Sequence, residues 1–219
     1  DRAERVWDQG DSGLPLGFEC VTALEYSLLS LISVGRTWFR DAALETMLKE
    51  LANDGFFASY SQVLILATGP DCGHAAARAA QHVPGAKVLL SRPAAAVSAE
   101  HAPFEDRFRD ARRVNPDTPP PLGPEALLHA AETYILFDPA HPAEAAQAAL
   151  FRASGTTRIA LPHTGAALDR VVAQGEALVP LTRHLVNGTL TAHQIRLILR
   201  PILRKDPGYL ARLANAAEV

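Results

Sequence analysis

The chain contains 219 residues, 48% of them hydrophobic, and its 21 Lys and Arg against 24 Asp and Glu give a formal net charge of -3. This length and apolar content predict a single α/β domain over residues 1–219 with a full buried core. The slightly acidic balance, without a block of Lys and Arg, argues against a nucleic-acid surface. No apolar run is long enough to span a bilayer.

The chain has two cysteines, Cys20 and Cys72. Two are too few for a disulfide scaffold or for a metal site built from thiolates. A reducing, cytoplasmic location is therefore the simpler expectation, and the sequence shows no signal peptide.

Three elements are predicted before the centre of the chain. Residues Phe18–Glu25 predict a short helix. Residues Tyr26–Val34 read YSLLSLISV, apolar with interspersed Ser, and predict a strand. Residues Trp38–Phe57 predict the clearest helix, because apolar residues recur at helical spacing until Asp54 and Gly55 end it.

The stretch Gln62–His82 reads QVLILATGPDCGHAAARAAQH. Residues Val63–Ala67 form a short continuous apolar run, as a parallel strand covered on both faces requires. A tight turn from Gly69 to Gly73 follows, where a helix close behind a strand leaves no room for Cβ atoms. Small residues then predict a helix packed closely on the sheet. A strand, a G-x-X-x-G turn and a helix form the geometry of a nucleophile elbow, whose middle residue here is Asp71.

A long segment, Ser91–Pro124, comes after the next short strand, Lys87–Leu90. It is rich in proline and contains one predicted helical patch, His101–Arg113. Long irregular segments inside compact domains are uncommon unless they are functional. Residues 92–124 are therefore expected to be either a lid over the sheet or a long solvated connection.

The second half of the chain continues the alternation of strands and helices. The predicted strands are Tyr134–Phe137 and Arg158–Leu161, and the predicted helices are Pro124–Glu132, Pro142–Ala153, Ala166–Ala173, Ala177–Val186, Thr191–Leu203 and Pro207–Ala216. This alternation predicts right-handed crossovers, a mainly parallel sheet and a three-layer α/β/α sandwich. Ligands bind beyond the carboxyl ends of such strands, which singles out Gly35, Asp71, Ser91, Asp138 and His163.

The order of Asp71, Asp138 and His163, each at a predicted strand end, is the order of nucleophile, acid and base in α/β-hydrolases. With Trp38-Phe39-Arg40-Asp41 and Phe137-Asp138-Pro139, it makes the chain resemble compact bacterial members of the α/β-hydrolase superfamily. The resemblance covers nearly everything after Leu14. Relatives with this pattern carry an elbow similar to G-S-S-M-G-G and, after the last strand, P-x-x-G-H.

The chain departs from that pattern at two positions. Asp71 stands where the family has its nucleophilic Ser, and Ala166 stands where the usual His would align. His163 lies three residues earlier, and Asp138 alone occupies its expected place. The resemblance therefore implies a degenerate serine-hydrolase triad.

Three chemical interpretations remain open. In the first, Asp71 is a carboxylate nucleophile that attacks carbon, as in haloalkane dehalogenases and epoxide hydrolases. His163 would then activate the hydrolytic water and be oriented by Asp138, with the Cys72 amide in the oxyanion hole. In the second, Cys72 is the nucleophile and His74 or His163 its base, although a buried structural Cys is the simpler explanation.

In the third interpretation the hydrolase site has been lost, and the protein binds a small molecule or a protein partner. Removal of either the nucleophile or the base costs several orders of magnitude in rate, so an isolated acid confers little. Asp138 would then form a turn, and Asp71 would cap the helix beginning at Cys72. The sequence favours this interpretation slightly over an Asp71 hydrolase.

Neither a metal nor a cofactor is predicted. The eight His residues form no H-x-x-x-H or H-E-x-x-H pair, which argues against a metal site. The run V-L-I-L-A-T-G-P-D-C-G loosely resembles the first motif of Rossmann methyltransferases. Such proteins place an acidic residue at the end of the next strand, where this chain has Ser91 and Arg92, so a methyltransferase is the weaker alternative.

Overall fold

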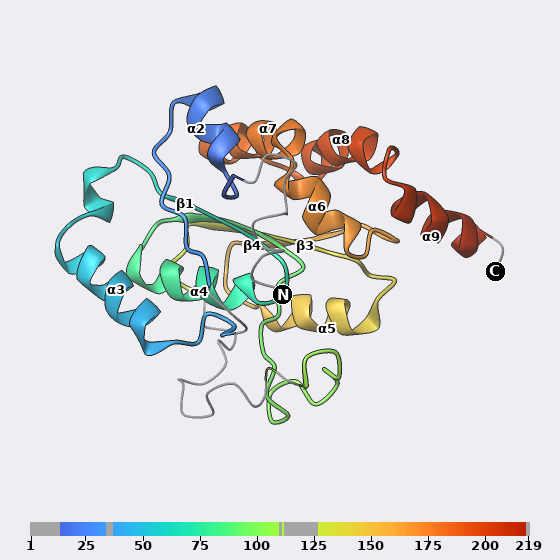
Figure 1. The fold of residues 1–219 in the computed structure, drawn as a ribbon, viewed down its shortest axis with the longest axis horizontal. Coiled ribbons are helices and arrows are strands. Elements are labelled where there is room, and N and C mark those ends of the chain that lie inside the picture. Colours follow the sequence, from blue (N-terminus) through green and yellow to red (C-terminus); the bar gives the residue numbers. More distant parts are fainter. Residues whose placement is uncertain (1–13, 34–36, 110, 112–126, 218–219) are drawn as a thin grey trace.

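The protein is an α/β structure built on a four-stranded, all-parallel sheet (Figure 1). The computed structural model describes residues 14–33, 37–109, 111 and 127–217. Its strands are β1 (Leu64–Thr68), β2 (Lys87–Ser91), β3 (Glu132–Phe137) and β4 (Thr156–Ala160), and they lie side by side in chain order. The predicted parallel sheet is confirmed.

Eight α-helices lie in the described part of the chain. They are α2 (Phe18–Leu24), α3 (Ala42–Asn53), α4 (Cys72–His82), α5 (Pro142–Leu150), α6 (Ala167–Ala173), α7 (Gly175–Val186), α8 (Ala192–Leu203) and α9 (Pro207–Ala217), with a short 3₁₀ turn at Phe57–Ser59. Thr191 caps α8 as predicted, because its hydroxyl accepts a hydrogen bond from the Gln194 amide at 3.2 Å.

The apolar side chains of the strands are packed on both faces of the sheet. On one face, Leu89, Leu136 and Ile159 pack against α6, α7 and α8. On the other, Val88, Leu90 and Ile135 pack against the alanines of α4 and the end of α5. Figure 1 shows α6, α7 and α8 on one side of the sheet and α4 and α5 on the other. Continuous apolar runs such as Val88–Leu90 are explained by this double covering.

Three local predictions are wrong. Residues 26–33 of the predicted strand Tyr26–Val34 form no strand and have irregular backbone, and position 34 lies outside the described residues. Their apolar composition matched a strand, but none of the described strands pairs with them. Residues 101–109 form turns instead of a helix, and 127–131 form a turn that leads into β3. Charged and aromatic residues did not determine a helix in the first segment, and the proline at position 124 did not determine one in the second.

The helix predicted from Trp38 begins only at Ala42, because Trp38 and Phe39 have positive φ angles of 56° and 52°, outside the helical range. The described part of the 92–124 segment folds back on the molecule. Ala94, Val97 and Ala111 form a small core there with Trp38 and Phe108. Positions 110 and 112–126 lie outside the described residues, so a lid remains a prediction.

No helix among the described residues of the protein has the length and hydropathy needed to cross a membrane.

Candidate functional site

The turn between β1 and α4 brings the predicted elbow to the carboxyl edge of the sheet. Gly69 has a φ of 92°, which favours glycine. A Cβ on Gly73 would lie 2.5 Å from the Pro93 Cβ, so α4 approaches the chain after β2 as closely as predicted. The Ala94 amide also donates to the Pro70 carbonyl at 3.0 Å. The sequence therefore predicted the turn and the crowding at Gly73, whereas Gly69 is explained by its positive φ.

Asp71 lies at this edge in an unstrained conformation. Its φ of -73° and ψ of -32° are helical, whereas the apex of a nucleophile elbow is strained. Helix α4 begins at Cys72 as expected, but the Asp71 side chain makes no capping hydrogen bond with the helix backbone. Beyond the effect of burial, the negative charge of its carboxylate acts on the neighbouring Cys72 thiol and raises the pKa of that thiol. Asp71 also lines a hollow of about 1220 Å³ beside β1.

Cys72 is held as a neutral thiol. Burial raises the pKa of Cys72 far above its usual range, and the negative charges of Asp71 and Asp169 raise it further. A thiolate is the reactive form of cysteine. The environment of Cys72 therefore disfavours its use as a nucleophile and agrees with a buried structural Cys. The amide of Cys72 as an oxyanion donor remains a prediction.

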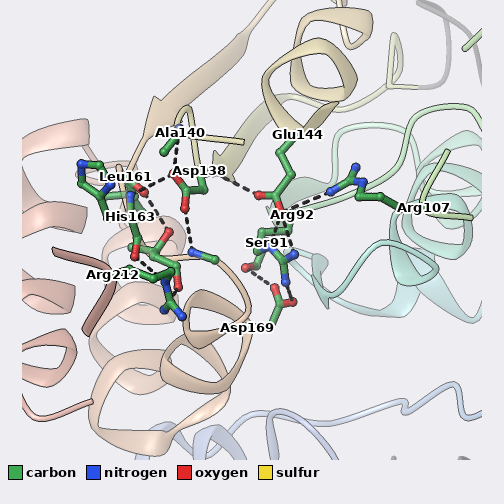
Figure 2. A network of polar contacts seen from close by, with 12 residues as sticks. Ser91, Arg92, Arg107, Asp138, Ala140, Glu144, Leu161, His163, Asp169 and Arg212 are labelled. Atoms are coloured by element: carbon green, nitrogen blue, oxygen red, sulfur yellow. Dashed lines mark hydrogen bonds and ion pairs between the residues drawn. The ribbon is translucent and has the colours of Figure 1, made fainter. Parts of the chain in front are cut away.

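Asp138 is buried after β3, and backbone amides occupy both of its carboxylate oxygens. Oδ1 accepts from the Ala140 and His163 amides, both at 2.9 Å, and Oδ2 accepts from the Gly165 amide at 2.8 Å. Two loops, one after β3 and one after β4, are thereby fixed to one carboxylate (Figure 2). Asp138 thus has the geometry of a residue that organises loops.

His163 lies directly beside Asp138 through its backbone, with a positive φ of 64°. Its carbonyl accepts from the Arg212 guanidinium at 2.8 Å. Within the described residues, no hydrogen bond joins the His163 imidazole to the Asp138 carboxylate. In Figure 2 the imidazole points away from Ser91 and Asp169. The structure therefore brings Asp138 and His163 together by backbone contacts.

Of the three predicted catalytic residues, Asp71 is the one found among the described residues that line the hollow. Ala166, which replaces the family's usual His, is among its lining residues, whereas Asp138 and His163 are absent from the part of the lining that the structure describes. Asp71 therefore shares an open space with the substituted position.

A charged network that the sequence did not single out fills the edge between these residues (Figure 2). Arg92 follows β2 and is paired with two carboxylates, Glu144 at 2.6 Å and Asp169 at 2.7 Å. The three side chains are 13%, 3% and 16% exposed. Glu144 lies in the first turn of α5 and Asp169 in the first turn of α6. Arg92 thus connects helices on opposite faces of the sheet.

Neighbouring groups extend this network. The Ser91 hydroxyl donates to Asp169 at 2.7 Å, and the Asp138 amide donates to Glu144 at 3.2 Å. Arg107 pairs with Glu105 at 2.6 Å and approaches Glu144 at 3.3 Å. The two cations are therefore surrounded by three carboxylates.

The pKa shifts follow from this arrangement. Burial disfavours the charged guanidinium, but the hydrogen bond to Glu144 and the charge of Asp169 outweigh it and raise the pKa of Arg92. Burial also raises the pKa of Asp169, against the opposing effects of Arg92 and Ser91. Glu105 behaves differently, since Arg107 and Gln147 overcome its burial and lower its pKa. Arg92 is thus held as a permanent cation.

Some of these residues could have been anticipated. Ser91 was expected at the edge from topology, and Arg92 follows it. Glu144 and Asp169 were missed, although acidic residues in the first turn of a helix are favoured by the helix dipole and point to a helix N-terminus. Their pairing with Arg92 required the relative positions of α5 and α6.

No group of three or more His, Cys, Asp or Glu side chains suited to a metal ion occurs among the described residues. Comparison of the chain with family models, curated proteins and solved structures found no match. The function must therefore be argued from the geometry of the site.

Proposed function

We propose that this protein is an α/β-hydrolase-like, three-layer protein whose catalytic site has been replaced and which acts as a non-catalytic binding protein. The observation that carries the proposal is the state of Asp138. Three backbone amides occupy its two oxygens, so the acid of the expected triad stabilises loops. Chain order, the parallel sheet and the β1–α4 turn support the hydrolase-like ancestry.

Three further observations support the loss of catalysis. Asp71 has relaxed helical backbone angles, and the Cys72 thiol is strongly disfavoured as a thiolate. The charges at the carboxyl edge are already paired with one another around Arg92. A hydrolase needs unpaired groups aimed at the charge that develops in the transition state. Charged groups that already pair with one another are better suited to stability than to turnover.

The rival function is a hydrolase in which Asp71 is the nucleophile, His163 the base and Asp138 the acid. One observation favours it: Asp71 is partly exposed and lines a hollow through which a substrate can reach its carboxylate. In this mechanism the carboxylate displaces a leaving group from carbon, and an activated water hydrolyses the resulting ester. A methyltransferase receives less support, because β2 ends at Ser91 and Arg92 without an acid.

Activity assays separate these functions. Purified protein is incubated with p-nitrophenyl esters, haloalkanes and epoxides, beside the Asp71→Asn and His163→Ala variants. We expect no turnover above the buffer control with any of the three proteins. Turnover that both substitutions abolish would overturn the proposal and establish the Asp71 hydrolase. Circular dichroism of the variants confirms that they are folded.

A further inference from the structure

The outer edge of β1 carries backbone groups that are unpaired within the described part of the chain. The backbone amide of Lys87 donates to the Val63 carbonyl, and the backbone amide of Gly69 donates to the Ser91 carbonyl. In a parallel ladder alternate residues bond the same neighbour, so residues 63, 65, 67 and 69 face β2. Leu64 and Leu66 then direct their N–H and C=O groups to the opposite side. Among the described residues these four groups have no hydrogen-bond partner.

The side chains of β1 nevertheless belong to a central strand. Leu64 and Leu66 pack against the core formed with α6, α7 and α8, while Ile65 and Ala67 pack against the core on the α4 face. Edge strands are normally protected by charges, proline or a covering element. β1 is apolar on both faces and has an open edge, which is the pattern of a strand that receives a neighbour.

The space beside this edge is large, and the two stretches of backbone that border it are uncharged. The hollow of about 1220 Å³ has residues 26–33 on one side and residues 63–68 on the other. Neither run contains a charged side chain. Leu28, Leu29 and Ile32 are 40%, 47% and 38% exposed, and residues 26–32 make no backbone hydrogen bond to the described residues. A second row of backbone groups therefore has no backbone partner in the part of the chain that the structure describes.

Size and hydrogen bonding together identify the class of ligand. Small-molecule pockets are typically about 300–1,000 Å³, and this hollow is larger. A lipid chain would fill apolar space but leave the four groups of Leu64 and Leu66 unsatisfied, which is costly where water is excluded. An extended peptide satisfies them through its own backbone, as in β-strand addition.

We propose that the hollow binds an extended, uncharged, apolar peptide segment of a partner protein, which pairs with the free edge of β1. This inference rests on the proposed binding function and names its partner. Apolar residues are expected at successive positions, because α2 packs with α7 on one face of this space and α3 with α4 on the other. A charged residue would meet no counter-ion along residues 26–33 or 63–68.

The test uses a fluorescein-labelled peptide with a Val-Ile-Val-Val-Thr centre flanked by Lys for solubility, titrated into the whole chain and followed by anisotropy. The control peptide has the same sequence with N-methyl groups on alternate residues, which removes its backbone donors. We expect saturable binding, weakened at least about tenfold by N-methylation. Equal binding of both peptides, or of neither, would overturn the proposal.

Protein variants locate the site. Leu66→Pro removes the N–H that faces the open edge, and an edge strand tolerates proline there. Leu66→Ala shortens the same side chain but keeps that N–H. We expect Leu66→Pro to lose binding and Leu66→Ala to retain it. Equal effects of the two substitutions would contradict recognition through the backbone.

Hydrogen exchange of the peptide-free protein tests the competing occupants. We expect amides 26–32 and those of Leu64 and Leu66 to exchange rapidly, and to slow on the order of 100-fold with saturating peptide. Slow exchange without peptide that persists on dilution would show that another segment of the same chain covers the edge of β1. Slow exchange that is lost on dilution would show that a second copy of the chain covers it. Either result overturns the proposal. Absence of peptide binding without turnover would leave the proposed binding function standing, whereas turnover would refute that function directly.

Discussion

Arg92 is the residue on which the carboxyl edge of the sheet depends. Its guanidinium bonds Glu144 on α5 and Asp169 on α6, and its backbone φ of 50° lies in the left-handed region. A conformation that is costly for a non-glycine residue persists where surrounding contacts determine it. The strained backbone and the two ion pairs indicate that Arg92 is placed to join the two helices.

Replacement of Arg92 by Met should therefore destabilise the protein strongly. The change keeps much of the side-chain volume but leaves the poorly exposed Asp169 without its cation and Glu144 with only Arg107. This should cost about 3 kcal/mol or more in free energy of unfolding. The matched control is Arg109→Met, because Arg109 pairs with Asp106 at 3.0 Å where the side chains are 70% and 66% exposed. That exposed pair should contribute less than about 1 kcal/mol. Urea denaturation measures the free energy of unfolding of both variants. Equal losses of unfolding free energy would contradict the role of Arg92.

Asp138 offers a way to distinguish a loop-organising acid from a catalytic one. Asp138→Asn keeps the shape of the side chain but replaces one acceptor oxygen by a donor NH₂ group. That group would face an amide of His163 or Gly165, so we expect a loss of about 1–3 kcal/mol in unfolding free energy. Asp106→Asn, at an exposed acid, serves as the control. A folded Asp138→Asn protein with unchanged stability would show that the loops do not depend on this carboxylate.

At the scale of elements, Gly73 determines how closely α4 packs behind β2. An added Cβ would overlap Pro93, whose ring and backbone cannot move freely. Gly73→Ala should therefore cost about 1–3 kcal/mol through overpacking. In Gly208→Ala, the control, the new Cβ meets only the ends of flexible side chains, the nearest being the Asp206 Oδ1 at 3.2 Å, and these can move away. Thermal unfolding should show a clearly lower midpoint for Gly73→Ala alone.

The sequence was sufficient for elements whose pattern is local. β1, β2 and β3 each contain a short apolar run, and α8 has its Thr191 cap and a regular apolar stripe. β4 reads TTRIA and begins two residues before the predicted Arg158–Leu161. Residues 26–33 show the opposite case. Their composition is that of a strand, but strand formation requires a hydrogen-bonding partner, and no described strand supplies one. Prediction failed there because pairing is a property of two segments.

The candidate site also contains features that the sequence predicted and features that it did not. Topology placed Asp71, Ser91, Asp138 and His163 at one edge because parallel strands end together. It could not give the direction of the His163 imidazole or the occupation of the Asp138 oxygens by amides. Those depend on loops of positive φ, at His163 and Gly165. The Arg92 network joins the N-termini of two helices on opposite faces of the sheet. It could not be predicted from the sequence, because their relative positions were not known.

At the scale of the whole molecule, the buried and half-buried carboxyls predict how stability depends on pH. Burial alone would raise the pKa of Glu105, but Arg107 and Gln147 outweigh it and lower that pKa. The pKa values of Glu45 and Asp206 are lowered in the same way, Glu45 by His82 and Arg78 and Asp206 by Arg170 and the Tyr209 amide. Asp169 has a raised pKa and acts in the opposite direction.

A carboxyl with a lowered pKa in the folded state binds its proton more readily in the unfolded state. Its stabilisation is therefore complete above the unfolded pKa, about 4.3 for Glu, and is lost as the pH falls through the folded pKa. Three carboxyls have lowered pKa values and one, Asp169, has a raised pKa. We therefore expect the urea midpoint to fall as the pH drops below about 4.

Glu105→Gln should flatten this decline, since it removes a carboxyl that is fully buried and paired. Glu100→Gln is the control, because Glu100 is 85% exposed and should leave the slope unchanged. The measurement is the urea midpoint between pH 6 and pH 3 for the three proteins. A Glu105→Gln protein whose midpoint falls as steeply as that of the original chain would show that acid sensitivity arises elsewhere. In that case the charges around Arg107 would not hold the 92–109 segment against the sheet.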